Sequence, residues 1–174
     1  MSDTVIKKRL ELITNRVKPE DEDTDNVSFQ GISPLLVKSG VFNPSKGRSA
    51  KKMADAITLL PPHIGDGILE IGVGSGALTL HATKQGMPAY ITGVDIDKNA
   101  LKSASVNFKR QGLEASLHIS DMFNDVAGVY DYIIFNAPTA HPAITNDNPA
   151  NTTVWDSSLT LKKRFIEGLK DHLN

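Results

Sequence analysis

Cysteine is absent from this 174-residue chain. Without thiols, the chain cannot form disulfide bonds, thiolate metal sites or a cysteine nucleophile. Long apolar runs are also missing, because the longest nearly apolar stretch, residues 67–80, contains Glu70 and several glycines and is too short to span a bilayer. The first ten residues lack the apolar core of a secretory signal, so we expect a soluble cytoplasmic protein.

The chain also has no excess of charge of either sign. Nineteen basic and twenty acidic residues give a net charge of −1, which argues against a protein that coats nucleic acid or a membrane surface. A basic cluster at Lys46, Arg48, Lys51 and Lys52 could contact phosphate or simply begin a solvated helix. The composition, 40% hydrophobic and 22% charged, is typical of a globular protein, and the length fits one domain.

The first 45 residues differ from the rest. Apolar residues at helical spacing predict an amphipathic helix over residues 4–17, which Pro19 ends. An acidic run at residues 20–25 is typical of a solvated linker, and short extended stretches between residues 27 and 42 predict one or two hairpins. We therefore divide the chain into an N-terminal helix, acidic linker and hairpin (residues 1–45) and a main domain (residues 46–174).

Strands and helices alternate from residue 68 onward, which predicts an α/β fold with a parallel sheet covered on both faces. The predicted strands are residues 68–71, 90–94, 115–119 and 132–135. The predicted helices are residues 49–60, 77–85, 98–111 and 159–173. Residues 139–157 are rich in Thr, Asn and Pro, which is typical of a long loop.

Each predicted strand is followed by a glycine-rich or polar element. The glycine loop, residues 72–76, follows the first strand, and Asp95, Asp121 and Asn136 follow the other three. In an open parallel sheet the carboxyl ends of the strands share one edge, and ligands bind there. We therefore expect these elements to form one ligand site.

The glycine loop alone leaves its ligand open. Its sequence fits the dinucleotide pattern G-x-G-x-x-[GA], with Asp95 about 20 residues further on, so a nicotinamide cofactor and a merely structural turn both remain possible. Glu70 favours a different ligand, because a carboxylate in an apolar strand is costly to bury unless a cation lies nearby. S-adenosylmethionine (SAM) carries an ammonium and a sulfonium, whereas a dinucleotide presents a pyrophosphate. The alternative is a surface glutamate on an edge strand.

Four motifs occur in order along the chain. They are Glu70-x-Gly72-x-Gly74-x-Gly76, Val94-Asp95-Ile96-Asp97, Ser120-Asp121-Met122-Phe123 and Phe135-Asn136-Ala137-Pro138. This set resembles the class I SAM-dependent methyltransferases, and is most similar to the group whose fourth strand ends in Asn-Pro-Pro-Tyr. That group includes the release-factor glutamine methyltransferases and the small-domain RNA methyltransferases.

The resemblance implies a SAM site at the carboxyl edge of the sheet. Glu70 would lie near the methionine amino group, Asp95 would hold the ribose hydroxyls, and Asp121 would accept from the adenine amino group. The other implied cofactor-binding residues are Gly72, Gly74 and Gly76 along the methionine and ribose, Ile96 on the adenine, and Met122 or Phe123 against the ring. Asp97 fits a helix N-cap better than Asp95 does.

The resemblance also implies that Asn136 and Pro138 form the catalytic, substrate-side pair. In the family, the asparagine side chain and the adjacent backbone carbonyl receive a planar nitrogen that takes the methyl group. This chain departs from the pattern at Ala137, which replaces a proline, and at Thr139, which replaces the aromatic residue that stacks on the substrate.

The implied function is N-methylation of a planar nitrogen in protein or RNA, with SAM as cofactor and no metal; a small-molecule acceptor stays open. Two alternatives remain: an NAD-dependent oxidoreductase, and a non-catalytic binding domain with the methyltransferase fold. The implied sheet is Rossmann-like and parallel, in the order 3-2-1-4. The family's sheet continues with further strands after the helix that corresponds to residues 159–173. The residues up to Asn174 do not supply these strands, so we expect a C-terminally incomplete domain.

Overall fold

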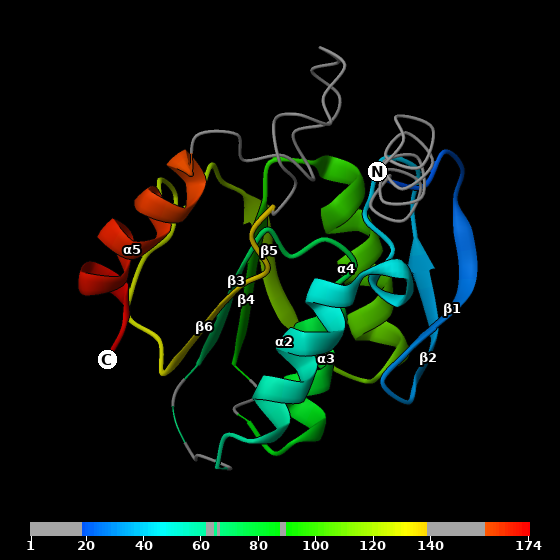
Figure 1. Cartoon of the computed structure of the whole chain (residues 1–174), viewed down its shortest axis with the longest axis horizontal. Coiled ribbons are helices and arrows are strands. Elements are labelled where there is room, and N and C mark those ends of the chain that lie inside the picture. The colour runs from blue at the N-terminus through cyan, green and yellow to red at the C-terminus, as the bar shows by residue number, and fades with distance from the viewer. Residues whose placement is uncertain (1–18, 62–64, 66, 88–89, 139–158) are drawn as a thin grey trace, which may run out of the picture.

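A computed structural model describes residues 19–61, 65, 67–87, 90–138 and 159–174. A parallel sheet lies at the centre of the described chain, with helices on both of its faces and a two-stranded hairpin outside the helices on one side (Figure 1). The helix predicted over residues 4–17 and the loop predicted over residues 139–157, with Thr139, lie outside the described residues.

The central sheet consists of four parallel strands in the order β5-β4-β3-β6. These strands are β3 (Ile68–Ile71), β4 (Ile91–Asp95), β5 (Ala115–Ile119) and β6 (Tyr132–Phe135). Ile71 pairs with Val94 of β4 on one side and with Phe135 of β6 on the other, so these strands end at the same level. The predicted α/β class and the predicted order 3-2-1-4 are therefore confirmed.

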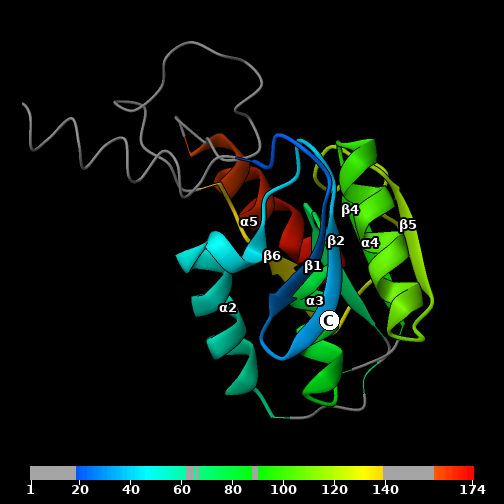
Figure 2. The same ribbon diagram turned by 90° about the vertical axis from the view of Figure 1, so that its right-hand side faces the viewer.

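In the described part of the chain, four α-helices and one short 3-10 helix surround the sheet. They are η1 (Pro44–Lys46), α2 (Arg48–Thr58), α3 (Ala77–Lys84), α4 (Lys98–Arg110) and α5 (Thr160–His172). Side chains alternate between the two faces of a strand, so Ile68 packs in the core beneath α2, α3 and α4, whereas Leu69 packs toward Phe165 of α5. Figure 1 shows α5 on the opposite side of the sheet from the other helices, and Figure 2 shows the two-stranded hairpin in front, on the side away from α5. Within the described ranges, no helix is long and apolar enough to cross a membrane.

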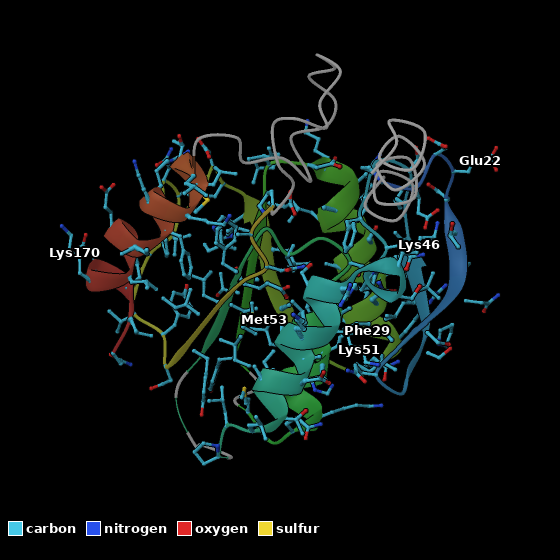
Figure 3. All side chains as sticks on the ribbon, viewed as in Figure 1. Glu22, Phe29, Lys46, Lys51, Met53 and Lys170 are labelled. Atoms are coloured by element: carbon cyan, nitrogen blue, oxygen red, sulfur yellow. The ribbon has the colours of Figure 1, made fainter. Side chains whose placement is uncertain are left out.

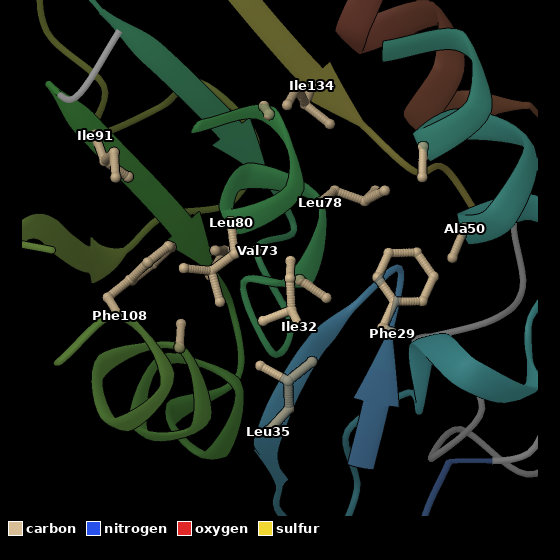
Figure 4. Close-up of a cluster of buried hydrophobic side chains, with 14 of the residues drawn as sticks. Phe29, Ile32, Leu35, Ala50, Val73, Leu78, Leu80, Ile91, Phe108 and Ile134 are labelled. Atoms are coloured by element: carbon tan, nitrogen blue, oxygen red, sulfur yellow. The ribbon is translucent and has the colours of Figure 1, made fainter. Parts of the chain in front are cut away.

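The predicted hairpin is confirmed as β1 (Thr24–Phe29) and β2 (Ile32–Val37), which pair in an antiparallel arrangement. Gln30 and Gly31 form the turn with φ values of 48° and 73°, as a two-residue hairpin loop requires. Leu35 is fully buried, and the hairpin shares one core with the helices beside it. Figure 4 shows Phe29 beside Ala50 and Ile32 beside Val73 and Leu80.

Strand β6 lies at the edge of the sheet, and an apolar cavity of ≈ 240 Å³ opens beside it. The cavity is lined by Met53, Ala56, Ile57 and Leu60 of α2, Met87, residues 132–135 of β6, and Phe165 of α5. At the start of this edge, Tyr130 makes a parallel bridge to Leu173, and the amide of Asn174 donates to Tyr130 O (3.0 Å).

Candidate functional site

The glycine loop connects β3 to α3 and curls back over the end of the sheet. Gly72, Gly74 and Gly76 have φ values of 66°, 53° and 75°, a left-handed conformation that side chains with a Cβ rarely adopt. A Cβ at Gly76 would lie 2.9 Å from the ring of Phe108 of α4, so that position also requires glycine for space. The amide of Gly76 donates to Val73 O (2.7 Å), which closes the turn just before α3 begins.

Glu70 is only 3% exposed, on the central strand β3. The alternative of a surface glutamate on an edge strand is therefore wrong. The carboxylate faces α3, where Glu70 Oε2 accepts from the hydroxyl (2.5 Å) and the amide (3.2 Å) of Thr79. Burial raises the pKa of Glu70 to about 8, and the nearby Asp95 adds to this increase. The structure thus places a proton-holding carboxyl group directly beneath the glycine loop.

Asp95 ends β4 and joins the glycine loop to the start of α4. Asp95 Oδ2 accepts from the amide of Gly74 (3.0 Å) and Oδ1 accepts from the amide of Asp97 (3.0 Å). Burial raises the pKa of Asp95. Asp97 is the N-cap of α4, accepting from the amide of Asn99 (2.8 Å), as its position in the sequence predicts.

The three apolar residues predicted to contact an adenine ring, or offered as alternatives for that role, lie in different environments. Ile96, immediately after β4, is 62% exposed beside Asp95. Met122 has a φ of 58° and is 7% exposed, buried in the core cluster with Leu69 and Val126. Phe123 packs on α5, with its ring stacked against those of Phe165 and His172, at centroid distances of 5.9 Å and 4.9 Å. Ile96 therefore offers the open apolar surface, and Met122 and Phe123 hold α5.

Asp121, which follows β5, has a charged partner. Arg164 of α5 donates to Asp121 Oδ1 (2.9 Å) and to the Asp121 carbonyl oxygen (3.2 Å). The Asp121 side chain is 55% exposed, so the ion pair is open to solvent. This carboxylate is thus held by a guanidinium, a partner that the sequence pattern did not reveal.

Asn136 and Pro138 follow β6 directly and are half-buried. Because Phe135 pairs with Ile71, Asn136 starts level with the first glycine of the loop, Gly72. The chain therefore brings the predicted substrate-side residues and the predicted cofactor-side residues to the same edge.

The basic cluster near η1 is partly neutralised. Lys46 Nζ lies 2.7 Å from Glu20 Oε1, and Asn43 Nδ2 donates to the same oxygen (2.7 Å). Lys51 is exposed and extends from the outer surface of α2 (Figure 3). In the part of the chain that the structure describes, no group of three or more histidine, aspartate or glutamate residues is arranged to hold a metal ion.

Three side chains that shape the site were not predicted: Thr79, Asn107 and Arg164. Thr79 orients Glu70, Arg164 holds Asp121, and Asn107 of α4 donates to the carbonyl of Ser75 inside the glycine loop (2.9 Å). Each contact joins residues on different elements, so no local spacing marks it. The arrangement as a whole offers one buried and one partly buried carboxyl group around a left-handed loop, which favours a ligand with a cation and hydroxyl groups over one with a pyrophosphate.

Comparisons with a family model and with known proteins agree on one family. The family model described as "Methyltransferase small domain" matches residues 35–164. A putative protein N5-glutamine methyltransferase of Methanocaldococcus jannaschii is 42% identical over 115 residues, which cover 64% of this chain and 53% of that protein. The release factor glutamine methyltransferase of Streptococcus pneumoniae is 39% identical over 71 residues, which cover 41% of this chain and 25% of that protein.

The solved structures agree on the fold. A 16S rRNA methyltransferase of T. thermophilus, in complex with AdoMet and guanosine, superposes with a TM-score of 0.62 at 20% identity, covering 88% of this chain and 39% of that chain. This chain thus spans about half, or less, of the length of these relatives.

Proposed function

Since this chain belongs to the methyltransferase small-domain family, we propose that it binds SAM at the carboxyl edge of the sheet and acts as a methyltransferase on a planar nitrogen. In this proposal residues 46–174 form the SAM-binding domain, and the hairpin of residues 1–45 packs into the same core. We further propose that the protein acts in the cytoplasm.

The observation that carries the proposal is the arrangement of Glu70 and Asp95 around the glycine loop. Glu70 lies under the loop, and Asp95 accepts from the Gly74 amide within it. A carboxylate beneath the loop suits the methionine ammonium, and Asp95 has the acceptor oxygens that a ribose diol needs. Gly72 and Gly74, where a Cβ would meet no atom closer than 4.0 Å, would let the backbone approach the ligand closely. Neither carboxyl group supplies the positive charge that would hold a pyrophosphate, which disfavours a nicotinamide dinucleotide.

At the adenine end of the proposed site, we expect three different kinds of contact: an apolar surface, a carboxylate oxygen and a backbone group. Ile96 supplies an exposed apolar surface for the ring, and Arg164 donates to Oδ1 and the carbonyl oxygen of Asp121 but not to its other carboxylate oxygen, Oδ2. That oxygen would accept from the adenine amino group. We propose that Met122 acts here through its backbone, since its side chain is buried in the core.

When bound, SAM would supply a methyl group on a sulfonium: the C–N bond would form as the C–S bond breaks with its electrons returning to sulfur, and the acceptor nitrogen would release one proton to solvent. The chain's own residues orient the two partners. Asn136 offers a side-chain donor and acceptor, and with Pro138 it would hold the acceptor nitrogen in line. Orientation and exclusion of water of this kind can contribute about 7–11 kcal/mol.

The class of methyl acceptor is proposed from the relatives. Their names describe glutamine in protein and ribosomal RNA as targets, and both present a planar nitrogen. We propose that the methyl acceptor is a protein or an RNA. Transfer to the metabolite pool in the assay below would instead identify a small-molecule acceptor. The site residues do not depend on this choice.

The test combines binding and transfer. Isothermal titration of the full chain with SAM, S-adenosylhomocysteine and NAD should give binding of the first two only; tight NAD binding would overturn the proposal. A labelled-methyl assay on fractionated extract, split into protein, RNA and metabolite pools, should then show which pool accepts the label. SAM binding with no transfer to any pool would favour the non-catalytic alternative.

Two variants separate the proposed roles. Asp95→Ala should weaken SAM binding first, because it removes the acceptor beside Gly74. Asn136→Ala should leave SAM affinity nearly intact while transfer falls by orders of magnitude. Wild-type transfer by Asn136→Ala would rule out the planar-nitrogen role of this residue.

A further inference from the structure

Asn107 connects three elements at once. It is fully buried on α4, and its Oδ1 accepts from the amide of Leu36 (2.7 Å). Its Nδ2 donates to the carbonyl of Leu36 (2.8 Å) and to the carbonyl of Ser75 (2.9 Å). One side chain thus joins the hairpin, the helix and the glycine loop.

The contact with Leu36 resembles strand pairing. A side-chain amide carries a donor and an acceptor, as a peptide group does. Asn107 therefore satisfies both backbone groups of Leu36 on the side of β2 that does not face β1. Buried backbone groups without partners are costly, so this pairing fixes how the hairpin docks on α4.

The contact with Ser75 fixes the loop from below. Ser75 is buried between Gly74, whose amide donates to Asp95, and Gly76, which packs on the ring of Phe108. Phe108 is the residue next to Asn107 on α4. Two successive residues of α4 therefore support two successive residues of the glycine loop.

We propose that Asn107 is a positioning residue for SAM binding: it transmits the docking of the β1–β2 hairpin to the glycine loop. The inference rests on the proposed function, because it concerns the same loop. Coupling between two sites is reciprocal, so SAM bound at the loop also stabilises the hairpin on α4.

The same helix provides a matched control. Ser103 Oγ accepts from the amide of Lys38 (3.1 Å) and donates to the carbonyl of Asn99 (2.9 Å). Ser103 is fully buried, as Asn107 is, and holds the same hairpin. None of the contacts of its hydroxyl group involves the loop. Ser103→Ala therefore removes one hydrogen bond to the hairpin and leaves the Asn107 bridge from Leu36 to Ser75 intact.

The test compares Asn107→Asp with Ser103→Ala by titration with SAM. Aspartate keeps the acceptor for the Leu36 amide and loses both donors, so the Ser75 carbonyl is left without its partner. We expect both variants to melt below the wild type, and only Asn107→Asp to bind SAM at least about tenfold more weakly, since one lost buried hydrogen bond corresponds to about that factor.

Hydrogen exchange of the wild-type chain gives a second readout that needs no variant. Saturating SAM should slow exchange of the Leu36 and Lys38 amides of the hairpin. Unchanged hairpin exchange on SAM binding, or equal SAM affinity in folded Asn107→Asp and Ser103→Ala, would overturn the inference and leave the proposed function standing. If the wild-type chain binds no SAM at all, the proposed function itself fails.

Discussion

The two faces of the central sheet are packed to different degrees. On one face, α2, α3, α4 and the hairpin form a continuous core in which Leu35, Ile68 and Leu80 are almost fully buried. On the other face, α5 contributes no fully buried residue, and its Ile166 is 68% exposed. The first face has a second layer in the hairpin, whereas the second face has a single amphipathic helix.

This difference separates the two halves of the proposed site. The glycine loop belongs to the well-packed face, since Val73 and Ala77 at its ends are part of that core. Asn136 follows β6, the edge strand beside the apolar cavity. The cofactor half therefore belongs to the well-packed core, and the acceptor half follows an edge strand beside the apolar cavity.

The largest expected effect tests the well-packed face. Leu35→Ala should lower the free energy of unfolding by about 2–5 kcal/mol, because it removes a fully buried side chain from the hairpin core. Leu161→Ala, on half-buried α5, should cost less than half as much. Chemical denaturation of both variants measures the difference. Equal losses would show that the two faces are equally important for stability.

On the other face we expect a smaller change in stability, opposite in sign to the change that a glycine-to-alanine substitution in a helix usually causes. Glycine to alanine within a helix normally stabilises by up to about 1 kcal/mol. At Gly168, however, a Cβ would overlap the ring of Phe123, so Gly168→Ala should destabilise by about 1–3 kcal/mol. Thermal melts would show the loss, and hydrogen exchange should place it in α5 and not in α4. A stabilised variant would mean that α5 can move off Phe123 freely.

The third prediction concerns pH and the buried carboxyl of the first face. Burial raises the pKa of Glu70 from 4.5 to about 8, so the folded state holds a proton that the unfolded chain releases. The stability that this proton provides is present below pH 4.5 and is lost as the pH rises toward 8. Melting temperature should therefore decline over that range, and Glu70→Gln should flatten the decline.

The matched control for that experiment is Glu114→Gln, at an exposed glutamate after α4. This variant should follow the wild-type pH profile. If the melting temperature of Glu70→Gln declines with pH as steeply as that of the wild type, titratable groups other than Glu70 cause the decline.

The smallest effect is expected at the surface of the hairpin. Arg110 of α4 donates to both carboxylate oxygens of Asp25 (2.6 Å and 3.0 Å), in an exposed ion pair. Exposed pairs of this kind contribute little, so Asp25→Asn should leave the melting temperature within experimental error of the wild type. A clear drop, removed by added salt, would show that charge as well as the buried core docks the hairpin.

The sequence predicts the framework of this molecule well, for local reasons. Short apolar runs followed by glycine or by small polar residues mark β3, β5 and β6 to the residue, because strand periodicity and turn residues act over a few positions. The order of the strands follows from the family resemblance. The polar ends of the strands then meet at one edge because parallel strands must share it.

The parts that could not be predicted depend on contacts between distant residues. The pairing of Asn107 with Leu36 spans 71 positions, and that of Arg164 with Asp121 spans 43. Met122 illustrates another limit: an apolar residue after a strand can face a ligand or the core, and here it enters the core. The roles given to Asn136 and Pro138 stay predictions.

The buried carboxyl of Glu70 has a consequence for the heat of ligand association. With a pKa of about 8 it holds a proton at neutral pH, and an ammonium group brought beside it would lower that pKa and expel the proton into the buffer. Association in a buffer with a large ionisation enthalpy, such as Tris, would then give a different apparent heat from association in phosphate, although the affinity is the same in both. The slope of heat against buffer enthalpy counts the protons released, and so reports on the innermost carboxyl group of the site without any substitution.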